Sequence, residues 1–231
     1  MAKKVRKKTQ SATATKSTNW YVIGGIGGLG ILFLAAMMYL AVMPPAAPEE
    51  FSLIGYCDDN PDACVSMGDK NAPVTIVEVS DYGCGHCRNF NSDTAPLLEQ
   101  QFVDTGIVRY VSLPFSLGPA TLIGANAAMC ANDQGAYFEY QTALFSESGE
   151  PDFLTPDGVT GVATDLGLDG AAFEDCLSSG KYAGSVTDNV AAAQKAGVDA
   201  TPSFFINGRL VEGNNPIESF ASFIAQAQQE G

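Results

Sequence analysis

A short run of β-branched residues ends just before two cysteines that stand three positions apart. Residues 74–79 read VTIVEV, which is typical of a buried β-strand. A D-Y-G tripeptide breaks that strand, and Cys84 and Cys87 follow in a C-G-H-C motif. We expect a helix to begin near Cys84 and to continue to about residue 102. The sequence therefore predicts a strand, a turn and a helix, with both cysteines in the first helical turn.

The rest of the C-terminal part contains further strand-like and helical patterns. A second strand is expected at residues 107–113 (IVRYVSL), and two short strands at 203–206 and 209–211 are joined by an Asn-Gly pair that is typical of a hairpin turn. A final helix is expected at residues 217–228. Glycines separate five more predicted helices, near residues 119–131, 134–147, 156–166, 169–178 and 181–196. Residues 51–70 show no regular pattern and are expected to be irregular.

This order of elements predicts an α/β fold. The first two strands and the helix between them suit a parallel pair with a right-handed crossover. The last two strands suit an antiparallel hairpin that a helix covers. Together they predict a small mixed sheet flanked by helices, with residues 71–118 and 198–231 as its core and residues 119–197 as a helical insertion.

The first 43 residues differ from the rest of the chain. Residues 1–19 contain six of the twelve basic residues, and no acidic residue precedes position 49. Residues 20–43 carry no charge, and as a helix they would be about 36 Å long, enough for a hydrocarbon core of about 30 Å. We favour an uncleaved transmembrane anchor over a cleaved signal peptide, because the stretch is longer than a signal core and its end, AVMPP, is a poor cleavage site.

An anchor of this kind also predicts where the domain lies. The basic tail should stay in the cytoplasm under the positive-inside rule. We therefore expect a single-pass protein of the cell membrane, whose C-terminal domain lies outside the cytoplasm in the periplasm or at the cell surface. Residues 44–70 would connect the two parts, beginning with a stiff proline-rich tether.

The charge of the domain excludes one class of partner. All 26 acidic residues follow the basic tail, and only the other six basic residues accompany them. Binding to nucleic acid needs basic side chains that neutralise phosphates, so we expect no nucleic-acid partner. An acidic surface of this kind is compatible with simple solubility and with attraction of basic substrates.

The predicted position of the C-G-H-C motif has chemical consequences. A C-x-x-C spacing on a first helical turn brings two sulfurs close enough to form a disulfide. The first sulfur would face free backbone N–H groups and the positive end of the helix dipole, which favour the thiolate. The dipole lowers a cysteine pKa by at most about 1.5 units, so hydrogen bonds and a positive neighbour must add to it. His86, the only histidine, lies between the two cysteines and is well placed to supply both.

Two other interpretations of this motif are weaker. An inert disulfide would stabilise little, because a four-residue loop removes little entropy from the unfolded chain. A zinc site would need four ligands, and the single histidine is already inside the motif.

Two segments of the sequence resemble the DsbA-like proteins of the thioredoxin superfamily. Residues 72–90 (APVTIVEVSDYGCGHCRNF) are similar to their active-site segment, and residues 201–208 (TPSFFING) to their cis-proline segment. The similarity extends over roughly residues 65–231. It implies a thioredoxin fold with a helical insertion and an enzyme that passes its disulfide to cysteines of substrate proteins. It also implies a membrane partner of the DsbB or vitamin-K-epoxide-reductase type, linked to quinone, for reoxidation, and no bound metal or organic cofactor.

The resemblance assigns roles to single residues. Cys84 would be the exposed attacking cysteine and Cys87 the buried resolving one. Glu78 would be a buried carboxylate beneath the disulfide that relays the proton of Cys87, although a charge in this strand also fits a wet sheet face. Pro202 would be cis, leaving the backbone of Thr201 free to pair with an extended substrate.

One feature departs from DsbA itself. The two residues between the cysteines are Gly-His, as in protein disulfide isomerases, where DsbA has Pro-His. Glycine does not pre-shape the first helical turn as proline does. We therefore expect a reduction potential nearer about −180 mV than about −120 mV.

The other four cysteines leave three possible pairings. We favour Cys130–Cys176 and Cys57–Cys64, because some relatives carry a second disulfide in the helical insertion. Free buried thiols remain the alternative for the first pair, and an auxiliary redox pair remains one for the second. The acidic loop between Cys57 and Cys64 resembles a calcium loop, but the glycine expected at position 63 is an alanine, so we expect no metal there.

The resemblance leaves three functions open. The first is an oxidase that donates the disulfide to substrates, which we favour. The second is a disulfide isomerase or reductase on the same fold, although residues 44–70 are short for the dimerisation domain that isomerases bring. The third is a non-enzymatic adaptor or chaperone, which would be expected to have lost one cysteine of the motif.

Overall fold

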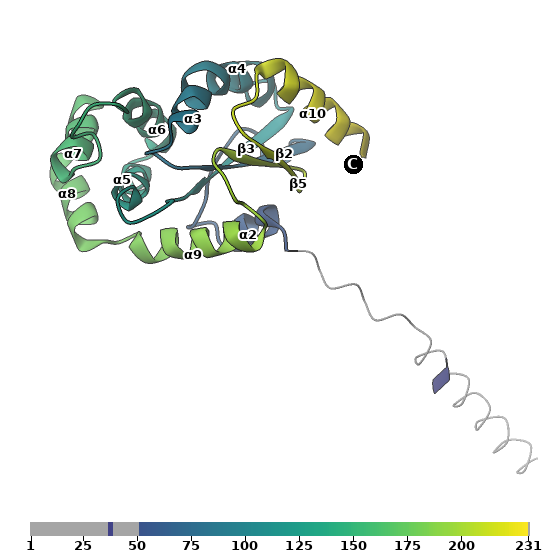
Figure 1. Cartoon of the computed structure of the whole chain (residues 1–231), viewed down its shortest axis with the longest axis horizontal. Coiled ribbons are helices and arrows are strands. Elements are labelled where there is room, and N and C mark those ends of the chain that lie inside the picture. The colour runs from purple at the N-terminus through teal and green to yellow at the C-terminus, as the bar shows by residue number, and fades with distance from the viewer. Residues whose placement is uncertain (1–36, 39–50, 231) are drawn as a thin grey trace, which may run out of the picture. The chain divides into compact units, whose positions relative to one another are not determined.

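The computed structural model describes residues 37–38 and 51–230 (Figure 1). Contacts divide the chain into residues 1–49 and residues 50–231, and the second unit carries the fold. The predicted basic tail and tether, and all of the predicted anchor except Met37 and Met38, lie outside the described residues. Within the described ranges, no helix combines the length and the apolar character that crossing a membrane requires.

A mixed five-stranded sheet forms the centre of the domain, in the order β1-β3-β2-β4-β5. The parallel pair is β2 with β3, and every other neighbouring pair is antiparallel. The strands span Val65–Met67 (β1), Val74–Ser80 (β2), Val108–Pro114 (β3), Ser203–Ile206 (β4) and Arg209–Glu212 (β5). The predicted parallel pair and antiparallel hairpin are therefore both present in one mixed sheet.

Helices cover both faces of this sheet (Figure 1). On one face lie α10 (Ile217–Glu230) and a helical run from residue 85 to residue 103, and on the other lie α2 and α9. The run consists of α3 (Gly85–Asn89), α4 (Ala95–Leu98) and two π-helical turns, Phe90–Thr94 and Glu99–Val103. Its beginning and end agree with the helix predicted from about residue 84 to residue 102.

Helices α5 to α8 of the insertion pack beside the end of the sheet, and its last helix, α9, continues along one face (Figure 1). The insertion consists of α5 (Leu122–Asn132), α6 (Tyr137–Ser146), α7 (Pro156–Asp165), α8 (Gly170–Ser179) and α9 (Ala183–Lys195). All five helices were predicted to within a few residues, because glycines separate them in the sequence, and side-chain caps mark the start of α7 and α8. Asp169 caps α8, for example, by accepting a hydrogen bond from Ala172 N at 3.1 Å.

Apolar side chains form a separate cluster in each layer. Phe90, Phe204 and Phe220 pack together between the sheet, the helical run of residues 85–103 and α10. Val77 and Phe205 pack on the opposite face against α2 and α9. The parallel strands are thus buried on both sides, which explains the continuous apolar run of β2.

The expectation that residues 51–70 are irregular was wrong. They contain α2 (Leu53–Asp59) and the edge strand β1, which pairs with β3. Tertiary contacts hold this segment: the Tyr56 hydroxyl donates to Asn189 Oδ1 at 2.9 Å, and Asn189 Nδ2 donates to Ala63 O at 2.8 Å. A seven-residue helix and a three-residue strand are too short to show a period in the sequence, so residues 51–70 join the sheet domain rather than precede it.

Candidate active site

Cys84 and Cys87 lie where β2 leads into α3, and their environments differ. Cys84 is the N-cap of the helix, in extended conformation, and its side chain is half-buried. Cys87 is completely buried. Both thiols are free in this structure, and the Cys84 thiol donates to the carbonyl oxygen of Thr201 at 3.4 Å. The helix start therefore presents one sulfur to solvent and keeps its partner inside.

The two sulfurs differ in acidity as well. Burial alone raises the pKa of Cys84, but the side chain of Thr201 and the backbone of Cys87 and His86 outweigh it, so this pKa is lowered. Burial raises the pKa of Cys87 far above its ordinary value. The site therefore favours a thiolate at Cys84 and a protonated thiol at Cys87 when both are reduced.

The segment before β4 faces these sulfurs. The bond between Thr201 and Pro202 is cis. Thr201 is buried, and its hydroxyl has no hydrogen-bond partner among the described residues. This side chain also lowers the pKa of Cys84 and Cys87, so the hydroxyl is available to donate to whichever sulfur carries charge. Thr201 and Pro202 thus lie where the cis-proline segment was expected.

Glu78 is completely buried in β2, not on a wet face of the sheet. Its carboxylate accepts hydrogen bonds from the Ser80 hydroxyl, from Asn91 Nδ2 at 3.3 Å and from Gln141 Nε2 at 3.0 Å. Asn91 Nδ2 also donates to the carbonyl oxygen of Cys87 at 3.0 Å. Asn91 therefore links the buried carboxylate to the backbone of the buried cysteine.

The role of His86 differs from the expectation in one respect. Its side chain is exposed, and its contribution to the lowered pKa of Cys84 comes through its backbone. Arg88, the residue after Cys87, donates to the carbonyl oxygen of Ser148, between α6 and α7. The basic side chain beside the motif therefore ties the active-site helix to the insertion.

Three buried polar residues of the site were missed in the sequence. Asp81 accepts hydrogen bonds from Gly83 N at 2.7 Å and from Leu117 N at 2.7 Å, and so holds the turn before Cys84. Asn91 stands four positions after Cys87, on the same helix face, which was a usable signal. Gln141 had none, because it reaches Glu78 from a helix of the insertion.

The remaining cysteines form two disulfides in the structure. Cys57–Cys64 joins α2 to the start of β1, and Cys130–Cys176 joins α5 to α8. In the loop that resembles a calcium site, Asp58 is paired with Arg109 at 2.7 Å. No group of three or more His, Cys, Asp or Glu residues in the described part of the chain is arranged to hold a metal ion.

Comparisons with known proteins agree with this arrangement. The family model described as "Thioredoxin" matches residues 60–226. The Na(+)/H(+) antiporter NhaA 1 of Salinispora arenicola is 31% identical over 199 residues, which cover 81% of this chain but only 29% of the antiporter. Disulfide bond formation protein D of Bacillus subtilis is 27% identical over 157 residues, which cover 63% of this chain and 68% of that protein.

A solved structure shows the same fold. The crystal structure of oxidised BdbD from Bacillus subtilis superposes with a TM-score of 0.65 and 23% identity, covering 71% of this chain and 92% of that one. The chain carries the C-x-x-C motif, the cis-proline and the helical insertion on this fold. It therefore belongs to the thioredoxin family.

Proposed function

We propose that this chain forms disulfides in substrate proteins by donating the Cys84–Cys87 disulfide, outside the cytoplasm and anchored by residues 20–43. The observation that carries the proposal is the contrast between the two sulfurs. Cys84 is half-buried with a lowered pKa, whereas Cys87 is buried with a raised pKa. A sulfur that is stable as a thiolate is a good leaving group, which favours transfer of the disulfide to the substrate.

The reaction proceeds in two exchanges. A substrate thiolate attacks the sulfur of Cys84, the bond to Cys87 breaks, and Cys87 takes up a proton as its raised pKa demands. A second substrate thiolate then attacks the substrate sulfur of the mixed disulfide, and Cys84 leaves as the stabilised thiolate. The substrate has lost two electrons, and the enzyme holds them as two reduced cysteines.

Three further residues have roles in this reaction. Glu78, connected to Cys87 through Asn91, relays the proton of the buried sulfur. Thr201 and Pro202 bind the substrate as an extended strand beside Cys84. The carbonyl oxygen of Thr201 already contacts the sulfur of Cys84, which supports a substrate path along this segment.

Two electrons must leave the enzyme after each cycle. A membrane enzyme of the DsbB or vitamin-K-epoxide-reductase type would accept them and pass them to quinone. Anchoring in the same membrane would keep the two proteins close, since tethering raises their effective concentration.

An isomerase is the second candidate, because the glycine between the cysteines is the feature that departs from DsbA. The full chain, purified in an uncharged detergent, should be mixed with a reduced or a scrambled multi-cysteine protein. An oxidase acts stoichiometrically when oxidised, and an isomerase acts catalytically when partly reduced. Cys84→Ser is the inactive control, and a chain that is active in neither state would be an adaptor.

The reduction potential separates these candidates further. Equilibration with glutathione should give a value near about −180 mV, and a value below about −250 mV would indicate a reductase instead. The location is tested separately with reporter fusions after residue 50. A reporter that is active only in the cytoplasm must stay silent there if the domain is exported.

A further inference from the structure

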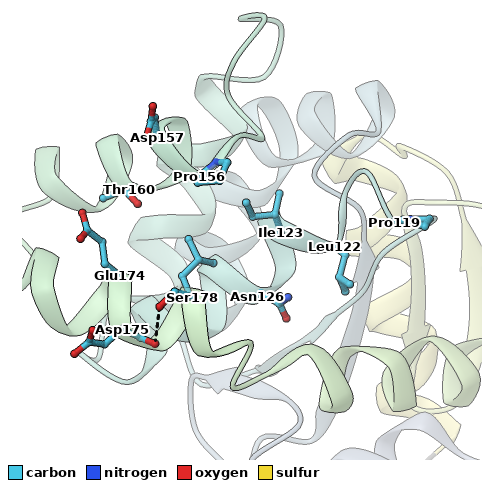
Figure 2. A pocket seen from close by; sticks show the side chains of 11 residues that line it. Pro119, Leu122, Ile123, Asn126, Pro156, Asp157, Thr160, Glu174, Asp175 and Ser178 are labelled. Atoms are coloured by element: carbon cyan, nitrogen blue, oxygen red, sulfur yellow. Dashed lines mark hydrogen bonds between the residues drawn. The ribbon is translucent and has the colours of Figure 1, made fainter.

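A hollow of about 810 Å³ opens in the helical insertion between α5, α7 and α8 (Figure 2). Its apolar wall comes from Leu122 and Ile123 of α5 and from Leu177 of α8, all half-buried against the core of the insertion. A hollow of this size, with an apolar wall open to solvent, is large enough to receive side chains of another polypeptide. We call it the insertion hollow.

Three acidic residues line the insertion hollow, and no basic residue does: Asp157, Glu174 and Asp175. All three are exposed, and none of their carboxylates takes part in a hydrogen bond or ion pair within the part of the chain that the structure describes. Figure 2 shows them on the side of the hollow opposite to Pro119 and Leu122. Unpaired carboxylates around one hollow attract cationic groups.

A further acceptor in the lining is also unused. The side-chain oxygen of Asn126 is buried and has no hydrogen-bond partner among the described residues. Buried polar atoms in proteins nearly always have a partner, so this oxygen indicates a donor that the described residues do not supply. A ligand that fits the insertion hollow would therefore combine an apolar side chain with positively charged groups.

The apolar end of the hollow adjoins the turn of residues 81–84, which leads into the C-x-x-C motif. Thr121 donates to Asp81, and a Cβ atom at Gly83 would lie 2.5 Å from Thr121 Cγ2, so Thr121 touches the residue before Cys84. The next residue, Leu122, lines the hollow. Leu117, which is 59% exposed, is bonded through its N–H to Asp81 at the same turn. The wall of the insertion hollow thus begins one residue after Thr121, which contacts this turn, and Leu117 adds an exposed apolar side chain at the same turn.

We propose that the insertion hollow is a second binding site for the substrate polypeptide, and that it selects substrates with an apolar residue followed by Lys or Arg near the reactive cysteine. The apolar side chain packs on Leu122 and Ile123, and the basic residues reach the three carboxylates beyond. This inference rests on the proposed function, because it assumes that substrate cysteines react at Cys84.

The test uses peptides that differ only in one tail. Each has two cysteines, a leucine and a tail of three lysines, three serines or three glutamates. Versions with serine in place of cysteine report binding to the full chain in an uncharged detergent, by fluorescence anisotropy. The hollow variant is Asp157→Asn with Glu174→Gln and Asp175→Asn. The matched control neutralises three exposed carboxylates elsewhere, with Asp104→Asn, Glu218→Gln and Glu230→Gln.

The lysine tail should bind the wild type about five- to tenfold more tightly than the serine tail at low salt, since surface charge pairs are individually weak. This preference should shrink as the salt concentration rises, disappear in the hollow variant and persist in the control. The oxidation rate of the cysteine peptides at low concentration should show the same ratio.

Several results would overturn the inference. Equal binding of all tails would do so, and so would equal loss of preference in both variants, which would assign the effect to the overall charge. A change of self-association in the hollow variant alone would assign the hollow to a second copy of the chain. Failure to oxidise even the serine-tailed cysteine peptide would contradict the proposed function, whereas the anisotropy would still decide whether the hollow binds basic tails.

Discussion

At the scale of single residues, the chemistry depends on two sulfurs whose acidities move in opposite directions. The pKa of Cys84 is lowered by hydrogen bonds that outweigh its burial, and the pKa of Cys87 is raised by burial. Because the two residues share one helical turn, the difference arises from exposure and from the few groups that reach each sulfur. Thr201 is the one side chain outside the motif that lowers both values.

Thr201→Val should raise the pKa of Cys84, because valine fills the same space without a hydroxyl that can donate to the thiolate. The measurement is the pH dependence of iodoacetamide labelling in a variant that lacks Cys87. Thr201→Ser keeps the hydroxyl and should titrate like the wild type. Identical titration of the valine variant would show that the hydroxyl does not contact the thiolate.

The lowered pKa of Cys84 also makes stability depend on pH. A cysteine that ionises more easily when folded stabilises the reduced fold above its unfolded pKa of about 8.5, and this contribution is lost as the pH falls through the lower, folded value. The raised pKa of Cys87 has the opposite effect: it lowers the stability of the reduced fold as the pH rises above about 8.5. The oxidised protein has neither thiol.

We therefore expect the unfolding free energy of the reduced protein, relative to the oxidised one, to rise with pH between the folded pKa of Cys84 and about 8.5. Urea titrations of both forms across this window measure it. Reduced Cys84→Ser supplies the control, whose difference from the oxidised protein should stay flat over the same range.

At the scale of secondary structure, the first turn of α3 has room for a larger residue in place of Gly85. A Cβ atom there would meet nothing within 4 Å, and Cys84 before it is extended at φ −88° and ψ 118°, as a residue before proline prefers. The sulfur of Cys84 uses the backbone of His86 and Cys87, not the N–H of Gly85. A proline at this position therefore removes no bond to the sulfur.

Gly85→Pro should fold normally and raise the reduction potential from about −180 mV towards about −120 mV, since proline pre-shapes the turn that presents the thiolate. That change is about a hundredfold in the equilibrium with glutathione. Gly85→Ala, which adds a side chain without the ring, should change the potential much less. An unchanged potential in the proline variant would show that the shape of this turn does not determine the reduction potential.

A second effect at this scale comes from α6. Gln141 donates to Glu78 across the boundary between the insertion and the sheet, and it also donates to Asn91 at 3.2 Å. Leucine in place of Gln141 would leave the carboxyl group of Glu78 with one donor fewer. The cavity that adjoins Gln141 and Asn91 is only about 50 Å³, so it offers little space for these side chains to rearrange.

Gln141→Leu should lower the unfolding free energy of the oxidised protein by about 1–3 kcal/mol, the usual cost of leaving a buried acceptor without its donor. Chemical denaturation measures this loss. Thr142→Ala, at an exposed position on the same helix, should cost much less. Equal losses in the two variants would mean that the contact with Glu78 contributes little.

At the scale of the whole molecule, two disulfides join parts of the chain, one within the helical insertion and one between α2 and the start of the edge strand β1. The Cys130–Cys176 bond spans a sequence separation of 46 and joins two helices of the insertion, whereas Cys57–Cys64 spans only 7. Closing a longer loop removes more conformational freedom from the unfolded chain. The first bond should therefore contribute more to stability.

Removing Cys130 and Cys176 together as alanines should cost up to about 4 kcal/mol, against about 2.5 kcal/mol for the same change at Cys57 and Cys64. Denaturation of the oxidised variants measures both. If Cys57 and Cys64 were an auxiliary redox pair, their removal would also slow disulfide donation, and a peptide oxidation assay on the same variants would detect that loss.

The sequence by itself determined the elements whose signals are local. These signals are the β-branched run of β2, the Asn207-Gly208 turn and the glycines that separate the insertion helices, and each depends on residues within a few positions of one another. The C-x-x-C motif belongs to this group, because its spacing alone places both sulfurs on one helical turn. These features specify a thioredoxin-type frame before any distant contact forms.

Only the tertiary structure decided which distant residues meet. Gln141 reaches Glu78 over 63 positions, Leu117 reaches Asp81 over 36, and Asn189 holds the carbonyl oxygen of Ala63 over 126. No pattern along the chain marks such partners, because each polar side chain has many possible ones and burial in the folded core selects among them. For the same reason, the edge strand β1 and the insertion hollow could be recognised only in the tertiary structure.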